Sequence, residues 1–191
     1  MIEVGLFFGS FNPIHIGHLA LANYMREFEN LDEVWFVVSP QNPFKQSSEL
    51  LDAELRLKMV DLATQDQENY KAIDIELQLP TPSYTIKTLD ALKSQYANYQ
   101  FSIIMGADNA QRLHHWKCYD EIISEHQILI YPRTGYIIDE EILHHNARLT
   151  KAPLVEMASS NIREWIRDGK ETPYLIPERV YNFIKQKNLY R

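Results

Sequence analysis

Short apolar runs and longer amphipathic segments alternate along the chain. Apolar runs of about four to eight residues are typical of buried strands, and apolar positions that recur every three or four residues are typical of helices. These patterns predict strands at residues 2–8, 34–39, 72–77, 101–105 and 127–131, and helices at 19–28, 55–64, 85–96, 139–146, 159–167 and 177–186. Such alternation predicts an α/β fold, in which helices flank an open parallel sheet.

The alternation continues along the whole chain without a linker, an internal repeat or a low-complexity segment. A chain of 191 residues is long enough to bury one sizeable core. We therefore expect a single domain spanning residues 1–191. In an open parallel sheet, ligands bind beyond the carboxyl ends of the strands, where the strand order switches direction.

Composition and charge exclude several classes of protein. The net charge of −7 disfavours binding to nucleic acid, which requires a basic surface. There is no apolar run long enough for a membrane span and no basic, cleavable leader, so we expect neither a membrane protein nor a secreted one. Cys118 is the only cysteine, which predicts a reducing, cytoplasmic setting and a buried or unreactive thiol.

The candidate chemistry starts in residues 9–18, GSFNPIHIGH, between the first predicted strand and the first helix. Backbone N–H groups and the dipole at a helix start attract anions, and Gly9 and Gly17 allow close approach. His15 and His18 share one face of the first turn, so both imidazoles can donate to one polyphosphate. This segment predicts a phosphate site. The alternatives are a metal pair, for which no third ligand is nearby in sequence, and a packing role.

The same segment resembles the signature G-[TS]-F-[DN]-P-x-H-x-G-H of the nucleotidylyltransferase superfamily, and most closely that of the bacterial nicotinate mononucleotide adenylyltransferases. That family joins a pyridine mononucleotide to the AMP part of ATP and releases pyrophosphate. The resemblance implies a Rossmann-like fold, ATP and nicotinate mononucleotide as substrates, and Mg²⁺ that arrives with ATP, held mainly by phosphates and water rather than by protein ligands. It also implies that Gly9, Ser10 and Phe11 bind ATP and that Asn12 binds the mononucleotide.

Residues 39–45, SPQNPFK, follow the second predicted strand and resemble the family's P-x-x-x-P-H-K loop. Phe44 stands where the family often has histidine, which leaves Lys45 as the only cation of the loop. The resemblance implies that Lys45 meets the substrate phosphates, where a mobile ammonium acts as a point charge. A solvated loop lysine is the alternative.

Residues 82–89, PSYTIKTL, resemble the family's P-S-Y-T-x-x-T-L turn. In the family this turn meets the pyridine substrate, which implies that Ser83, Tyr84 and Thr85 bind the mononucleotide and that Thr85 and nearby backbone amides take its carboxylate. Because Ser83 or Thr85 at a helix start would also satisfy free N–H groups, a capping role is compatible with this one.

Residues 103–109, IIMGADN, end the fourth predicted strand and resemble the family's G-x-D turn. The resemblance implies close approach of ATP at Gly106 and a ribose contact by Asp108, for which an N-cap is the alternative. Trp116, in a segment similar to L-x-x-W, offers an aromatic face to a cationic pyridinium ring, unless it belongs to the core. Arg133, in a segment similar to R-x-G-Y, is a candidate contact for the phosphate of the mononucleotide.

Residues 157–163, MASSNIR, resemble I-S-S-T-x-I-R, which opens a helix over the ATP phosphates in the family. Ala158 replaces the first serine of that pattern and Ser160 replaces its threonine. Ser159 and Ser160 still supply hydroxyls at a helix start, and Arg163 supplies a positive charge. An ordinary capped amphipathic helix is the alternative, although one helix start can serve both purposes.

The resemblance covers most of the chain and implies one reaction. The 5′-phosphate of the mononucleotide attacks the α-phosphorus of ATP in line, and pyrophosphate leaves. Catalysis of this kind rests on positioning and charge stabilisation. The expected catalytic residues are His15, His18, Lys45 and Arg163.

Other interpretations stay open from the sequence alone. A different superfamily enzyme, acting on phosphopantetheine, a cytidylyl donor or nicotinamide mononucleotide, shares the first motif. The letters HIGH at residues 15–18 also occur in class I aminoacyl-tRNA synthetases, but the chain is short, and it lacks a KMSKS-like loop and a basic face. A nucleotide sensor without turnover is a non-enzymatic alternative. The sequence also leaves open whether subunits associate into a homo-oligomer.

Overall fold

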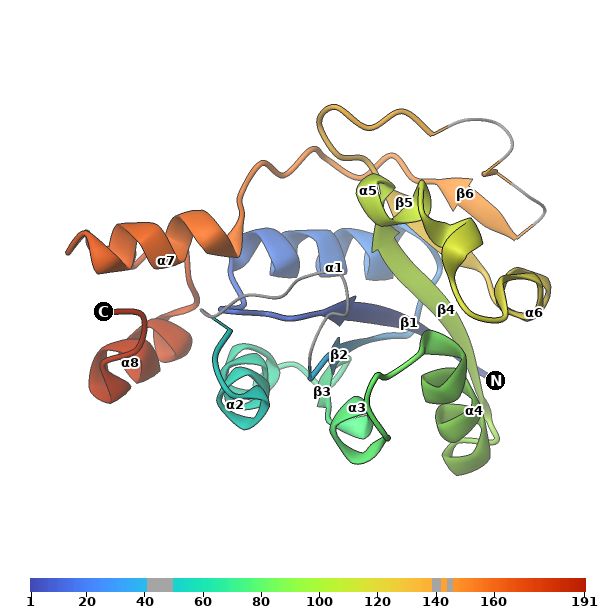
Figure 1. The fold of residues 1–191 in the computed structure, drawn as a ribbon, viewed down its shortest axis with the longest axis horizontal. Coiled ribbons are helices and arrows are strands. Elements are labelled where there is room, and N and C mark those ends of the chain that lie inside the picture. The colour runs from blue at the N-terminus through green and yellow to red at the C-terminus, as the bar shows by residue number, and fades with distance from the viewer. Residues whose placement is uncertain (41–49, 139–141, 144–145) are drawn as a thin grey trace.

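The computed structural model describes residues 1–40, 50–138, 142–143 and 146–191. Within these residues, six parallel strands form one open sheet with helices on both faces (Figure 1). The strands are β1 (Ile2–Gly9), β2 (Glu33–Val38), β3 (Tyr70–Ile73), β4 (Tyr99–Gly106), β5 (Ile128–Tyr131) and β6 (Ala147–Leu149). The helices are α1 (Ile16–Phe28), α2 (Ala53–Thr64), α3 (Ile75–Gln78), α4 (Thr85–Gln95), α5 (Ala107–Ala110), the 3₁₀ turn η1 (Leu113–His115), α6 (Tyr119–Glu125), α7 (Ser159–Arg167) and α8 (Glu178–Lys187).

The strand order β3-β2-β1-β4-β5-β6 changes direction between β1 and β4. Gly9 at the end of β1 is in register with Val38 of β2, and Phe7 is in register with Ile104 of β4. The carboxyl ends of these three strands therefore meet at one edge of the sheet. This edge is the switch point at which open α/β sheets bind ligands.

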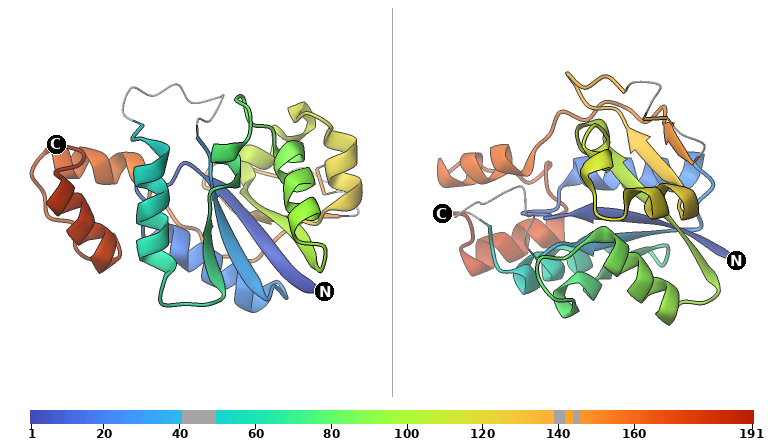
Figure 2. Two further views of the ribbon diagram at one scale, coloured as in Figure 1. Left: turned by 90° about the horizontal axis from the view of Figure 1, so that it is seen from below. Right: turned by 45° about the vertical axis from the view of Figure 1, so that its right-hand side comes forward.

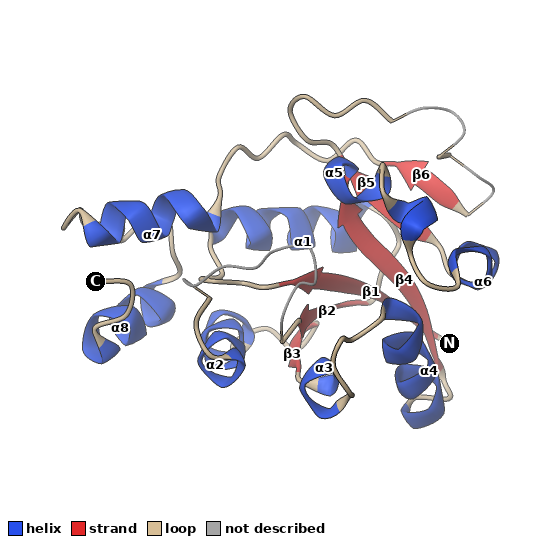
Figure 3. Cartoon of the chain, viewed as in Figure 1, coloured by secondary structure: helices blue, strands red, loops and turns tan. Residues whose placement is uncertain are grey.

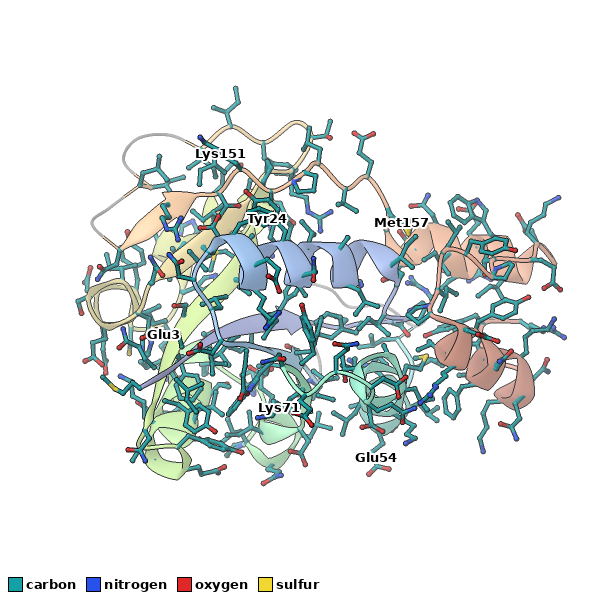
Figure 4. All side chains as sticks on the ribbon, turned by 180° about the vertical axis from the view of Figure 1, so that it is seen from behind. Glu3, Tyr24, Glu54, Lys71, Lys151 and Met157 are labelled. Atoms are coloured by element: carbon teal, nitrogen blue, oxygen red, sulfur yellow. The ribbon has the colours of Figure 1, made fainter. Side chains whose placement is uncertain are left out.

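Each face of the sheet carries its own buried cluster, because successive strand residues point to opposite sides. Phe7 and Phe36 pack on the face that α1 covers, and Leu6 and Trp35 pack on the face that α4 covers. Figure 3 shows α1 and α4 on opposite sides of the strands, and Figure 4 shows α1 from behind with Tyr24 on it. Burial on both faces explains why the strands read as continuous apolar runs.

Helices α7 and α8 lie together at one end of the molecule (Figure 2). Their apolar side chains Ile162, Val180 and Ile184 join the cluster on the α1 side of the sheet. Met157, where the chain enters α7, packs against the same cluster (Figure 4). This packing brings the last helices next to the turn that leads into α1.

The predicted fold class is confirmed, and most predicted elements are present within one or two residues. The strand predicted at 72–77 is partly wrong, because β3 ends at Ile73 and α3 follows at once. Ile75 and Glu76 are both buried there, so the alternation that suggested a strand does not describe which side chains face inward. Strand β6 was not predicted, since only Ala147 of its three residues is buried. The helix predicted at 139–146 lies largely outside the described residues.

A buried arginine on α2 holds together the segments that follow β1 and β2 at the edge of the sheet. Arg56 is fully buried, and its guanidinium donates to the backbone carbonyls of Ser10, Ser39, Pro40 and Leu51 at 2.7–2.8 Å. These carbonyls belong to the turn after β1 and to the two sides of the segment between β2 and α2. The planar fork of arginine can serve several acceptors at once, whereas lysine cannot.

We predict that Arg56→Met lowers the free energy of unfolding by roughly 3–5 kcal/mol, because four partly buried carbonyls lose their donor. Lys58→Met on the same helix is the control, since Lys58 is half exposed and its ion pair with Asp61 is a surface pair. Urea unfolding of both variants measures the difference. Equal losses for the two variants would show that the hydrogen bonds of the buried guanidinium do not stabilise the fold.

Candidate active site

The turn after β1 is compact and strained. Phe11 has a left-handed backbone (φ 46°) although it is not glycine, a conformation that persists where surrounding contacts impose it. Its ring is buried and packs edge-on against His18, with centroids 5.2 Å apart. Phe11, expected at ATP, therefore lies behind His18 as its support and does not line the cavity described below.

His15 and His18 lie against each other at the start of α1, as their spacing predicts. Their rings stack with centroids 3.7 Å apart, and the backbone N–H of His15 donates to Nδ1 of His18 at 3.3 Å. Because Nδ1 of His18 accepts this hydrogen bond, the proton of a neutral His18 ring is on Nε2. A side chain at Gly17 would come within 3.0 Å of the His15 ring and 2.7 Å of Val155. Glycine is therefore required for this stacking.

Both imidazoles are held neutral. Burial, with a smaller effect from the nearby Arg133 guanidinium, lowers the pKa of His15 to about 4. Burial, with smaller effects from His15 and Arg133, holds the pKa of His18 well below its ordinary value. At neutral pH the pair therefore offers N–H donors without a positive charge, and Arg133 supplies charge beside it.

Arg133 and Asp108 face each other over Gly106, at the ends of β4 and β5. The Arg133 Nε lies 3.8 Å from the Asp108 Oδ1, and a side chain at Gly106 would collide with that carboxylate oxygen and come within 3.2 Å of the Arg133 Nε. Arg133 also lies over the Tyr131 ring, 5.2 Å from its centroid. Gly106 is thus required for this pair, and the structure places all three predicted residues together.

A cavity of about 570 Å³ opens at the carboxyl ends of β1 and β4. Seven of the predicted substrate-binding residues line it: Gly9, Ser10, Ser83, Tyr84, Thr85, Asp108 and Trp116. Trp116 is half-buried, so its side chain is partly packed against the protein and partly open to the cavity. Tyr131 lines the same cavity and lies under Arg133, which connects the cavity to the imidazole pair.

Glu76 is a cavity residue that the sequence analysis missed. Its buried carboxylate accepts hydrogen bonds from the hydroxyls of Thr88 at 2.9 Å and Ser83 at 3.3 Å. Burial raises its pKa, while hydrogen bonds from Ser39, Thr88 and Ser83 oppose the shift. Because the Ser83 hydroxyl donates to Glu76, it presents a lone pair to a substrate and cannot also donate to a carboxylate.

Three basic side chains of the cavity were also missed: Arg112, His115 and Lys117. The Lys117 ammonium lies 4.5 Å from the centroid of the Tyr84 ring, so it covers the predicted mononucleotide turn. No local pattern marks these residues, because only the fold brings η1 and its flanks to face the start of α4. Arg112 and Lys117 bring positive charge to the cavity lining in a protein of negative net charge.

Four of the remaining predicted residues, Asn12, Ser159, Ser160 and Arg163, lie in the turn after β1 or in α7 and do not line the cavity. Ser159 at the start of α7 donates to the Pro13 carbonyl at 2.9 Å, and Arg163 donates to the Asn12 carbonyl at 3.0 Å. The side-chain oxygen of Asn12 is buried and accepts hydrogen bonds inside the protein. Ser160 is exposed at the same helix start. Lys45 and Phe44 lie outside the described residues.

Three further properties concern the described part of the chain. It contains no group of three or more histidine, cysteine, aspartate or glutamate side chains arranged to hold a metal ion. None of its helices combines the length and apolar character that a membrane crossing needs. Cys118 is exposed, at the start of α6, rather than buried.

The chain matches known proteins along its whole length. Residues 6–165 match the cytidylyltransferase-like family model. A "Probable nicotinate-nucleotide adenylyltransferase" of Flavobacterium psychrophilum is 47% identical over 192 residues, with all of both chains covered. One of Bacteroides fragilis is 46% identical over 97% of this chain and 92% of its own.

The chain belongs to the nicotinate-nucleotide adenylyltransferase family. The enzyme is therefore a nucleotidyltransferase with a cytidylyltransferase-like fold, as the motifs imply. The Plasmodium falciparum nicotinic acid mononucleotide adenylyltransferase complexed with NaAD has the same fold, with a TM-score of 0.77 at 19% identity over 100% of this chain and 98% of that one. The same protein complexed with APC gives a TM-score of 0.74 at 20% identity, again over 100% and 98% of the two chains.

We predict that the enzyme loses stability between pH 6.5 and 4 because of His15. Its pKa is about 4 when folded and near 6.5 when unfolded. The unfolded state therefore takes up the proton first as the pH falls, which costs up to about 3 kcal/mol by pH 4. Urea unfolding across this range should show a smaller loss for His15→Gln. Parallel pH profiles for the two proteins would mean that His15 is not held neutral.

Proposed function

We propose that the enzyme transfers the AMP group of ATP to nicotinate mononucleotide through the residues described above. The product is deamido-NAD, and pyrophosphate is released. The observation that carries this proposal is a stacked, neutral imidazole pair at a helix start, connected through Arg133 and Tyr131 to a cavity of about 570 Å³. The relatives' names support the same acceptor.

Polar atoms without partners indicate where the substrate phosphates bind. Among the described residues, Nδ1 of His15 is buried and makes no hydrogen bond, and the buried Nε of Arg133 makes none either, with the Asp108 carboxylate 3.8 Å away. Buried polar atoms of this kind usually have a partner, so these sites point to a ligand. We place the triphosphate of ATP across His15 and His18, and we assign Arg133 to it as well, in place of the mononucleotide phosphate for which its motif made it a candidate. Ile16 N–H already donates to the Leu175 carbonyl, so the side chains carry much of the binding at this helix start.

The reaction then needs positioning and charge stabilisation but no covalent intermediate. The 5′-phosphate of the acceptor attacks the α-phosphorus of ATP, and the bond from that phosphorus to the bridging oxygen of pyrophosphate breaks. Negative charge grows on the leaving oxygens, where the Nε2–H of His18 can donate. Arg163 and Lys45 add positive charge on the pyrophosphate side. ATP enters as its Mg²⁺ complex, and the metal neutralises part of the phosphate charge.

The cavity suits the pyridine mononucleotide. Trp116 offers an aromatic face to the cationic ring, and Thr85 at the start of α4 offers its hydroxyl and nearby N–H groups to the carboxylate. Because the Ser83 hydroxyl already donates to Glu76, we assign the hydrogen bond to the substrate carboxylate to Thr85. Lys117 and Arg112 add a positive field that favours the acid over the amide. Asp108 remains the proposed ribose contact. An exposed single cysteine is compatible with the proposed cytoplasmic location.

The assay that tests this proposal measures pyrophosphate release with MgATP and a panel of acceptors. We expect turnover with nicotinate mononucleotide and a kcat/KM at least about tenfold lower for nicotinamide mononucleotide, because the amide leaves donors facing donors. A ratio near one would contradict the acceptor assignment. Binding of both substrates without pyrophosphate release would instead indicate a sensor, and turnover with phosphopantetheine alone would indicate a different superfamily member.

We predict that His18→Ala lowers kcat by about 10²–10³-fold with a smaller change in ATP affinity. The reason is that its Nε2–H acts on charge that develops only in the transition state. Steady-state kinetics and calorimetric titration of ATP measure the two effects separately. His114→Ala is the control, because His114 is an exposed histidine outside the cavity lining. A near-normal kcat in folded His18→Ala would rule out this role.

We predict that Trp116→Ala raises the KM for nicotinate mononucleotide more than the KM for ATP. Aromatic and cation–π contacts of this kind contribute roughly 0.5–2 kcal/mol, or about two- to thirtyfold in affinity. Trp165→Ala is the matched control, because Trp165 is an exposed tryptophan on α7 that does not line the cavity. An equal rise in both KM values would indicate that Trp116 shapes the site without contacting the pyridine ring.

A further inference from the structure

We propose that Tyr190 is a positioning residue of the ATP site, whose hydroxyl fixes Asn12 and thereby the backbone that holds Arg163. This inference rests on the proposed function, because it assumes that Arg163 and the turn after β1 bind the phosphates of ATP. Tyr190 follows α8, far along the chain from that turn. No sequence motif pointed to it.

The contact joins two distant parts of the chain at one buried atom. The Tyr190 hydroxyl donates to Oδ1 of Asn12 at 2.9 Å, and the backbone N–H of Leu51 reaches the same oxygen at 3.4 Å. A backbone N–H can only donate, so the accepting atom of Asn12 is its oxygen. The Asn12 side chain is therefore fixed by donors from the start of the α2 region and from the residues after α8.

The backbone at Asn12 and Pro13 in turn holds the polar residues of α7. Arg163 donates to the Asn12 carbonyl at 3.0 Å, and Ser159 donates to the Pro13 carbonyl at 2.9 Å. A shift of Asn12 would therefore move Arg163, which we assign to the ATP phosphates, together with the start of α7 that Ser159 holds to Pro13. The contacts run from Tyr190 through Asn12 to Arg163. None of these three residues lines the cavity of about 570 Å³ in which we place the pyridine mononucleotide.

The surroundings of the hydroxyl keep it a donor. Burial raises the pKa of Tyr190 well above its ordinary value, although the positive charges of Arg163 and Arg56 oppose the shift. The hydroxyl thus stays protonated at any pH at which the enzyme works. The hydroxyl therefore donates to Asn12 without adding negative charge near the two guanidinium groups that hold the same turn.

The test compares Tyr190→Phe with Tyr174→Phe. The first substitution removes only the hydroxyl, and the second does the same to a tyrosine that is 88% exposed. We expect Tyr190→Phe to raise the KM and the calorimetric Kd for MgATP roughly five- to fiftyfold, as for a buried acceptor that loses its donor. We propose that the Asn12 side chain, whose oxygen already accepts from Tyr190 and Leu51, does not contact the mononucleotide, so the KM for nicotinate mononucleotide should stay within about twofold. Tyr174→Phe should change neither value.

Two outcomes would overturn the inference. One is unchanged MgATP affinity in Tyr190→Phe, and the other is an equal rise in KM for both substrates, which is what a general loss of structure produces. A double-mutant cycle with Asn12→Ala gives a second criterion. In that background Tyr190→Phe should have no further effect on the Kd for MgATP, and additive effects would contradict the proposed route. Because binding is measured without an acceptor, failure of the proposed function would show separately, as a wild-type enzyme without pyrophosphate release.

Discussion

The carbonyl groups of the turn between β1 and α1 are held by donors from distant parts of the chain, and the site depends on this constraint. Arg56 on α2 donates to the Ser10 carbonyl. From α7, Arg163 donates to the Asn12 carbonyl and Ser159 donates to the Pro13 carbonyl. Phe11 keeps its left-handed backbone within this support. The turn therefore presents His15 and His18 to a ligand in a fixed geometry, which lowers the cost of ordering them on binding.

Burial gives the imidazole pair its particular chemistry. The low pKa of both rings keeps them uncharged, so they can sit in contact without repulsion. Neutral donors placed in a partly dry site act strongly on charge that develops there, and they do not demand a counter-ion before substrate arrives. The positive charge is supplied separately, by Arg133 near the imidazoles and by Arg112 and Lys117 in the cavity lining.

Sequence reasoning recovered those parts of the fold and site that are local. The strands β1, β2, β4 and β5 follow from their apolar runs, and the histidine pair follows from a spacing of three at a helix start. Glu76 and Tyr190 could not be found in this way, because their importance lies in hydrogen bonds to residues far away in sequence. The packing of the Phe11 ring against His18 could not be found in this way either, for the same reason.

The central claim is that a neutral His18 donates its Nε2–H to the phosphates of ATP. Nitrogen-15 NMR of the imidazoles at neutral pH tests it directly, with and without a non-hydrolysable ATP analogue and Mg²⁺. The account predicts an Nε2-protonated, Nδ1-unprotonated ring in the free enzyme, and a large shift of the Nε2–H signal on addition of the analogue. A charged ring, a proton on Nδ1, or an Nε2–H signal that the analogue leaves unchanged would contradict it.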